Sequence, residues 1–130
     1  MENSPGKVNI TLPEQAMDQK PNILVLCGRN KQRSRTAEQI FRHDARIQIR
    51  SAGVSPSSDR KVTENDLRWA DLVCVMESTQ RDKIKELYRD LELPKIAVLH
   101  IPDAYAFMDE ELIELLTDSI NEQLQIAFQL

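Results

Sequence analysis

The fold is decided by one stretch of the sequence, NILVLCGRNKQRSRTAEQIF, residues 22–41. Its first six residues, 22–27, are almost entirely apolar, which is typical of a strand buried on both faces of a parallel sheet. A short polar segment follows, and apolar residues then recur at helical spacing, which predicts a helix over residues 34–44. The sequence therefore predicts a buried strand that ends in a thiol, Cys27, directly before a cationic loop and a helix.

Three further apolar runs predict strands, at residues 46–50, 71–76 and 95–99. In the first of them, RIQIR, only Ile47 and Ile49 face one side, which indicates an edge strand covered on one face. The segment SAGVSPSSDR (51–60) is rich in Ser, Gly and Pro and predicts a turn.

Helical patterns fill the intervals between these strands and follow the last one. Thr63 with Asp66 predicts a capping arrangement that opens a short helix. Ser78 is expected to cap a helix over residues 79–91, and Asp109 to cap a long final helix with one apolar stripe.

The order of these elements predicts an α/β fold, a three-layer sandwich in which a four-stranded parallel sheet has helices on both faces. Right-handed crossovers and the edge strand favour the strand order 2-1-3-4. In that order the chain reverses direction beside the first strand, where ligands of open α/β sheets bind. We expect this domain at residues 22–130, after a flexible arm at residues 1–21 in which VNITL alternates as a strand would.

Composition indicates an acidic protein with a local basic site. The 130 residues carry a formal net charge of -4, with a pI near 5.2. Nucleic acid and membrane surfaces are therefore not expected as partners, and no apolar run reaches the roughly 20 residues of a membrane span or resembles a signal peptide. Cys27 and Cys74 lack the spacing of a zinc site or a disulfide framework, so a cytoplasmic location is expected.

The loop C-G-R-N-K-Q-R-S, residues 27–34, has the residue types of an anion site. Backbone N–H groups in a loop from strand to helix can form a nest for a tetrahedral anion, and the helix N-terminus adds positive potential. Arg33 can hold two oxygens of the anion, and the Ser34 hydroxyl can donate to a Cys27 thiolate. A buried cysteine that only packs is the alternative, but the strand end, the following Ser and the following helix favour a nucleophile.

Asp103, in the loop after the fourth strand, is a candidate for proton transfer. An Asp after Pro102 is by itself typical of a turn. In the predicted strand order, however, this loop lies on the same rim of the sheet as Cys27. An acid at that position can protonate a leaving oxygen and then activate water.

Together these segments resemble the low-molecular-weight protein tyrosine phosphatase family. The resemblance covers residues 22 to about 120, and its matching pieces are CGRNKQRS, TAE, SAGV, DLRWADLVCVME and IPDAY. It implies that Cys27 is the nucleophile that becomes phosphocysteine, that Arg33 binds the phosphoryl oxygens, and that Asp103 is the general acid and then the base.

The resemblance also implies a phosphate-binding loop made of Gly28, Arg29, Asn30, Lys31, Gln32 and Ser34. Asn30 would hold the shape of this loop, and Tyr105 would form a wall of the substrate slot. Arg29 departs from the family pattern, in which Gly is usual at that position. Ser51, in the SAG segment, is expected to support the loop from outside.

The expected function is therefore a metal-independent phosphomonoester hydrolase without a cofactor. Its partners would be a phosphorylated protein or a small aryl phosphate, phosphotyrosine above all, and inorganic phosphate as the product. A thiol-dependent arsenate reductase is one alternative, although the further cysteines that such enzymes use are missing. A non-catalytic protein that binds phosphorylated ligands on the same fold is the other.

Overall fold

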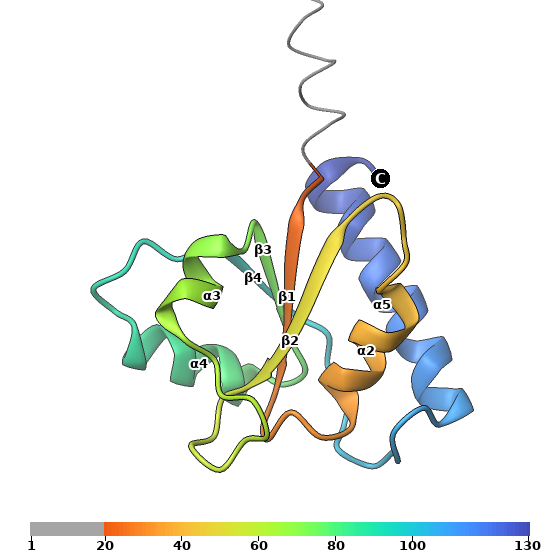
Figure 1. The fold of residues 1–130 in the computed structure, drawn as a ribbon, viewed down its shortest axis with the longest axis horizontal. Helices are drawn as coiled ribbons and strands as arrows, with labels where there is room; N and C mark the ends of the chain where they lie inside the picture. The colour runs from red at the N-terminus through yellow and green to blue at the C-terminus, as the bar shows by residue number, and fades with distance from the viewer. Residues whose placement is uncertain (1–19) are drawn as a thin grey trace, which may run out of the picture.

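A computed structural model describes residues 20–130, and Figure 1 shows how they are arranged. One sheet contains four parallel strands: β1 (Asn22–Cys27), β2 (Gln48–Gly53), β3 (Leu72–Val75) and β4 (Lys95–Val98). Their order is β2-β1-β3-β4, so the predicted order 2-1-3-4 is confirmed. The arm predicted at residues 1–21, with its VNITL segment, lies almost entirely outside the described residues.

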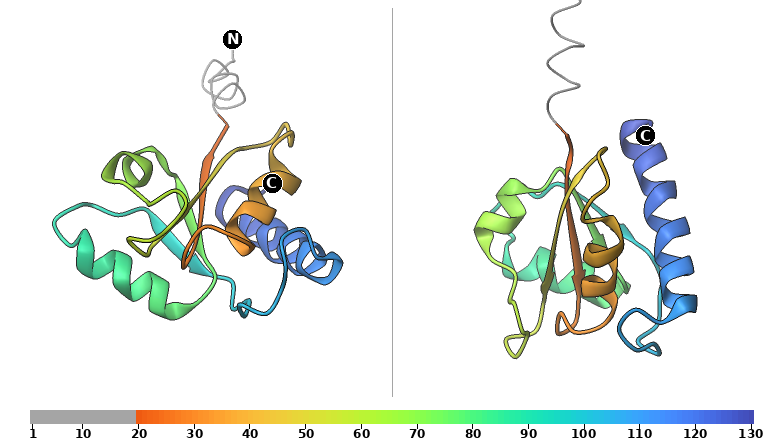
Figure 2. Two further views of the ribbon diagram at one scale, coloured as in Figure 1. Left: turned by 60° about the horizontal axis from the view of Figure 1, so that its bottom comes forward. Right: turned by 45° about the vertical axis from the view of Figure 1, so that its right-hand side comes forward.

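Helices cover both faces of this sheet, as the three-layer prediction requires (Figures 1 and 2). The helices α2 (Arg33–Phe41) and α5 (Glu110–Phe128) pack on one face, and α3 (Glu64–Trp69) and α4 (Ser78–Leu87) pack on the other. Alternate residues of β1 point into these two cores: Ile23, Val25 and Cys27 toward α2 and α5, Leu24 and Leu26 toward α3 and α4. Cys27 therefore ends a strand whose direction is fixed by packing on both sides.

The final helix is held by its cap and by one apolar stripe. The side chain of Asp109 accepts the backbone N–H groups of Glu111 and Leu112, as predicted for an N-cap. The stripe consists of Leu112, Leu116, Ile120 and Leu124, all fully buried. Each such side chain contributes roughly 1.5–3 kcal/mol when it is removed from water. No helix within residues 20–130 is both long and apolar enough to cross a bilayer.

The predicted bounds of β2 and of the elements beside it are wrong. This strand covers Gln48–Gly53 rather than 46–50, so the turn predicted at 51–60 begins only at Val54. The reason is that Ser51, Ala52 and Gly53 pair with Val25, Leu26 and Cys27 of β1. Pairing with a central strand outweighs the turn preference of Ser and Gly. Preceding it, α2 ends at Phe41 rather than at residue 44.

The helix predicted at 79–91 also differs. Glu77, not Ser78, occupies the N-cap position of α4, and the helix ends at Leu87. The side-chain oxygen of Gln80 accepts the backbone N–H groups of Met76, at 2.8 Å, and Glu77, at 3.1 Å, so the start of the helix is satisfied one residue earlier. Leu87, the last residue of this helix, is 52% exposed.

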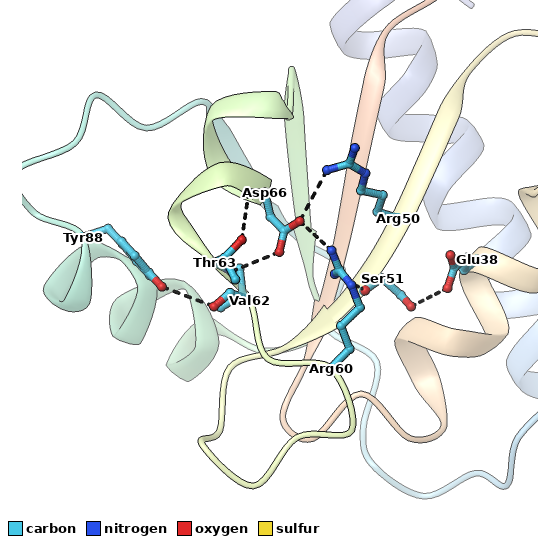
Figure 3. A network of polar contacts seen from close by, with 8 residues as sticks. All are labelled: Glu38, Arg50, Ser51, Arg60, Val62, Thr63, Asp66 and Tyr88. Atoms are coloured by element: carbon cyan, nitrogen blue, oxygen red, sulfur yellow. Dashed lines mark hydrogen bonds and ion pairs between the residues drawn. The ribbon is translucent and has the colours of Figure 1, made fainter.

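Asp66 is the centre of a polar network that fastens α3 to β2 (Figure 3). Its side chain is only 2% exposed, and it forms the predicted capping box with Thr63. Arg60 donates to the Asp66 carboxylate at 2.7 Å and to the carbonyl of Ser51 at 2.8 Å, and Arg50 approaches the carboxylate at 3.4 Å. Because Arg60 belongs to the segment after β2, the network fixes where that segment returns to the sheet.

The network predicts how stability depends on pH. Burial raises the pKa of Asp66, but hydrogen bonds from Arg60 and Thr63 outweigh this effect and hold the pKa below its ordinary 3.8. A carboxyl group with a lowered pKa stabilises the fold above its unfolded pKa, and this contribution is lost as the pH falls through the folded pKa. We expect Asp66→Asn to lower the free energy of unfolding at pH 7 by roughly 2 kcal/mol.

Urea denaturation across a pH series measures this effect. The decline of stability below about pH 4 should be shallower in Asp66→Asn than in the wild type. Glu64→Gln is the matched control, because Glu64 lies on the same helix but is exposed. An unchanged pH slope in Asp66→Asn would show that the network does not couple this carboxylate to folding.

Candidate active site

Cys27 lies at the C-terminal end of β1, with its sulfur held by the loop that follows. The Sγ atom accepts the backbone N–H of Asn30 at 3.2 Å and lies 3.0 Å from the Oγ of Ser34. The Ser34 hydroxyl also donates to Oδ1 of Asn30 at 2.8 Å. A hydroxyl has one proton, so Ser34 either donates to Asn30 while accepting from a neutral thiol, or donates to the thiolate. Asn30 has a φ of 57°, in the left-handed region that Asn tolerates.

The turn after β2 holds the carbonyl side of the same loop. Its backbone N–H groups donate to three successive carbonyl oxygens: Val54 to Cys27 at 3.0 Å, Ser55 to Gly28 at 2.8 Å, and Asp59 to Arg29 at 3.1 Å. In a planar trans peptide, a carbonyl and the N–H of the next residue point in opposite directions. The N–H groups of residues 28–30 therefore point away from the turn. That of Asn30 meets the sulfur, which is the direction an anion above Cys27 requires.

Gly53 allows this close approach between turn and loop. A Cβ at Gly53 would lie 2.0 Å from Oγ of Ser58 and 2.9 Å from the backbone carbon of Arg29, so only Gly fits there. Arg29 itself is not among the non-glycine residues with a positive φ. Arg at this position therefore imposes no left-handed strain on the loop. On the other side of β2, the Ser51 hydroxyl donates to Glu38 of α2 at 2.6 Å (Figure 3).

The guanidinium of Arg33 is oriented by two groups from neighbouring strand ends. This side chain is 4% exposed, and its Nη1 donates to Oε2 of Glu77, after β3, and to the carbonyl of Ile101, after β4, at 2.7 Å. Its Nε is buried without a hydrogen-bond partner among the described residues and lies 3.8 Å from Oδ1 of Asp103. With Nη1 engaged, the edge formed by Nε and Nη2 remains for a ligand. This edge suits bidentate binding of a phosphoryl group.

Glu77 was not predicted from the sequence as a site residue. The available signal was its place two residues after β3, which the predicted strand order puts beside the end of β1. A carboxylate at that position lies next to any cationic side chain of the loop after β1.

A pocket of about 260 Å³ opens over the sulfur. It is lined by Cys27, Gly28, Arg29, Lys31, Gln32, Arg33 and Asp103. The structure thus brings Cys27, Arg33 and Asp103 together in this pocket. Asn30 and Ser34 are buried and do not line it. Asp103 provides the only carboxylate of this lining, against three cationic side chains. The arrangement can bind an anion with several oxygens and present a sulfur nucleophile and a carboxyl group to it.

Tyr105 does not line this pocket. Its hydroxyl donates to Oε2 of Glu111 at 3.1 Å, and its ring packs against the core beneath α2 and α5. Lys31, at the mouth of the pocket, forms an ion pair with Asp59 at 3.6 Å.

The second thiol, Cys74, is placed in β3 opposite Val25 of β1 and is fully buried. Burial raises its pKa to about 12, against a smaller opposing effect of Lys95. It therefore stays a neutral thiol that packs in the core. Within residues 20–130, no three His, Cys, Asp or Glu side chains are grouped to hold a metal ion.

Comparison with known proteins shows similarity in structure. No protein-family model matches the sequence, and no curated protein matches it. The chain is similar to the tyrosine phosphatase Wzb from Escherichia coli K30 in complex with phosphate, at 25% identity over 83% of this chain and 99% of that one, with a TM-score of 0.65.

Two other solved structures are similar to the chain. The low-molecular-weight protein tyrosine phosphatase SP-PTP from Streptococcus pyogenes is 18% identical, with a TM-score of 0.69 over 82% of this chain and 92% of that one. The YwlE arginine phosphatase from Geobacillus stearothermophilus is 21% identical, with a TM-score of 0.57 over 82% of this chain and 94% of that one. The fold implied by the sequence resemblance is confirmed.

The contact between the turn and the loop predicts opposite effects at two glycines. Gly53→Ala should lower the free energy of unfolding by roughly 2–4 kcal/mol, because its Cβ collides with backbone. Gly28→Ala is the matched control, since a Cβ at Gly28 meets no heavy atom within 4 Å. Its stability should equal or slightly exceed that of the wild type. Urea denaturation of both variants measures this, and equal losses would contradict the described packing.

Proposed function

Since the chain has the fold of the low-molecular-weight protein tyrosine phosphatases, we propose that it is a metal-independent phosphomonoester hydrolase that acts through a phosphocysteine intermediate. The observation that carries this proposal is the free, buried Nε of Arg33 beside Cys27 and Asp103. An unpaired buried donor costs about 1–3 kcal/mol, and a phosphoryl oxygen would supply the missing acceptor.

In the first step, the Cys27 thiolate attacks phosphorus, and the bond from phosphorus to the leaving oxygen breaks. Asp103 gives its proton to that oxygen, so the alcohol or phenol leaves neutral. The Nε and Nη2 edge of Arg33 binds two of the equatorial oxygens, and the N–H groups of residues 28–30 face the same charge. Ser34 donates to the sulfur while it is a thiolate.

In the second step, water attacks phosphocysteine, and the bond between phosphorus and sulfur breaks. The Asp103 carboxylate, left ionised by the first step, accepts a proton from the water. Inorganic phosphate leaves, the thiolate is restored, and Asp103 regains its proton. No redox partner enters this cycle.

The substrate class we propose is phosphotyrosine or another aryl phosphate. Support comes from the tyrosine phosphatases among the similar structures. The arginine phosphatase among them makes phosphoarginine the competing substrate. A comparison of kcat/KM for phosphotyrosine and phosphoarginine separates these two classes.

Arsenate reduction is less well supported by the side chains present. Such a reaction needs further thiols to carry electrons, whereas this chain has two cysteines and Cys74 is buried in the core. The other alternative is a protein that binds phosphorylated ligands without hydrolysing them. Such a protein would bind the ester below but release no phosphate from it.

Hydrolysis of para-nitrophenyl phosphate in the presence of a chelator tests the proposal. We expect Cys27→Ser to lose at least about 10³-fold in kcat, because the nucleophile is removed. Cys74→Ala should keep its activity, because Cys74 lies in the core away from the pocket. Asp103→Asn should lose more activity on phenyl phosphate than on para-nitrophenyl phosphate, whose leaving group needs less protonation. Folded wild type without phosphate release across pH 5–8 would refute the hydrolase.

The ion pair between Arg33 and Glu77 predicts a positioning role for the carboxylate. We expect Glu77→Gln to lower kcat by about 10-fold, because Nη1 loses its charged partner and the guanidinium is less well oriented. Glu86→Gln, on the exposed part of α4, is the control and should match the wild type. An unchanged kcat in Glu77→Gln would mean that the carbonyl of Ile101 orients Arg33 sufficiently.

A further inference from the structure

A second cavity, of about 270 Å³, adjoins the catalytic pocket and has no role in the proposed chemistry. It lies between the turn after β2 and the first turns of α4. Its lining consists of Gly28, Val54, Ser55, Pro56, Thr79, Gln80 and Lys83. Gly28 lines both cavities, and a Cβ there would have no heavy atom within 4 Å. No side chain therefore separates the two cavities at this residue.

Gln80 presents a fixed hydrogen-bond donor to this cavity. The side chain is 7% exposed, and its oxygen accepts the N–H groups of Met76 and Glu77. These two bonds identify which end of the amide is oxygen and leave the NH₂ group free. Between residues 20 and 130, this NH₂ group has no hydrogen-bond acceptor. Among the described residues, only Nε of Arg33 is a buried side-chain nitrogen or oxygen without a partner, so the Gln80 NH₂ group is accessible and can donate to a ligand in this cavity.

Lys83 supplies a positive charge to the same cavity. Its ammonium group has no carboxylate within 4.0 Å in the described part of the chain, and no Asp or Glu is part of the lining. The Thr79 hydroxyl adds a further donor, and Val54 with Pro56 forms an apolar wall. A cation, two donors and an apolar wall suit an anionic group carried on a short apolar stem.

We propose that this cavity is a substrate subsite that binds the carboxylate of an Asp or Glu adjacent to the phosphorylated residue of a peptide. The inference rests on the proposed function, because it assumes that the phosphoryl group occupies the neighbouring catalytic pocket. Because Gly28 lines both cavities, the phosphoryl group and the carboxylate would belong to neighbouring residues of the peptide rather than to distant ones. Lys83 and Gln80 determine the preference for an acidic neighbour.

The test is equilibrium binding of phosphotyrosine peptides to the Cys27→Ser protein by titration calorimetry at low salt. The peptides carry Glu or Gln directly before or directly after phosphotyrosine. We expect a Glu peptide to bind about five-fold more tightly than its Gln counterpart, as for a partly exposed ion pair. Adding Lys83→Glu should remove or reverse this preference. Adding Lys85→Glu, with the same charge change on the same helix but outside the cavity, should keep it.

Equal affinities for the Glu and Gln peptides, or an equal effect of Lys83→Glu and Lys85→Glu, would overturn the subsite. So would a failure of every peptide to bind. Hydrolysis of para-nitrophenyl phosphate by the wild type tests the proposed function separately, because this small ester has no carboxylate for the subsite. A wild type that hydrolyses the ester without the peptide preference keeps the hydrolase and loses the subsite. A Lys83-dependent preference without any hydrolysis keeps the subsite and loses the hydrolase.

Discussion

The direction of three peptide groups determines what the rest of the site can do. The carbonyl oxygens of Cys27, Gly28 and Arg29 are bonded to the turn after β2, so the N–H groups that follow them face the pocket. This constraint depends in turn on Gly53, whose missing side chain lets turn and loop approach. It also depends on Asp66 and Arg60, which fix the far end of the turn against α3. The orientation of these N–H groups thus depends on packing several residues away from them.

Arg33 complements this backbone site with a charge whose orientation comes from two other strands. Glu77 follows β3 and Ile101 follows β4, and both hold the same nitrogen of the guanidinium. Residues that follow β1 and β4 line this pocket, and residues that follow β2 and β3 hold the loop and Arg33 that line it. The parallel sheet, rather than any single motif, therefore brings Cys27, Arg33 and Asp103 together.

Much of the fold followed from the sequence because packing and local signals agreed. The apolar run of β1, the capping box of Thr63 and Asp66, and the stripe of α5 each specify one structure. The turn predicted at Ser51 to Gly53 was wrong, because these residues pair with β1. Such pairing is a long-range effect that composition does not reveal. Cys27, Arg33 and Asp103 could be proposed together because strand order places their loops on one rim. Glu77 and the Gln80 cap depend on side-chain directions, which spacing alone does not give. The same holds for Tyr105, whose direction is set by the hydrogen bond from its hydroxyl to Glu111.

The register between β1 and β3 has a consequence for oxidation. Cys74 pairs with Val25, two residues before Cys27, and both thiols face the same core. Strand spacing and rise then separate their Cα atoms by roughly 8 Å, beyond the ~7 Å limit at which a disulfide can close without backbone movement. The chain has no third cysteine. A sulfenic acid formed on Cys27 by peroxide therefore has no internal thiol within reach, so a disulfide on Cys27 would need a thiol from another molecule.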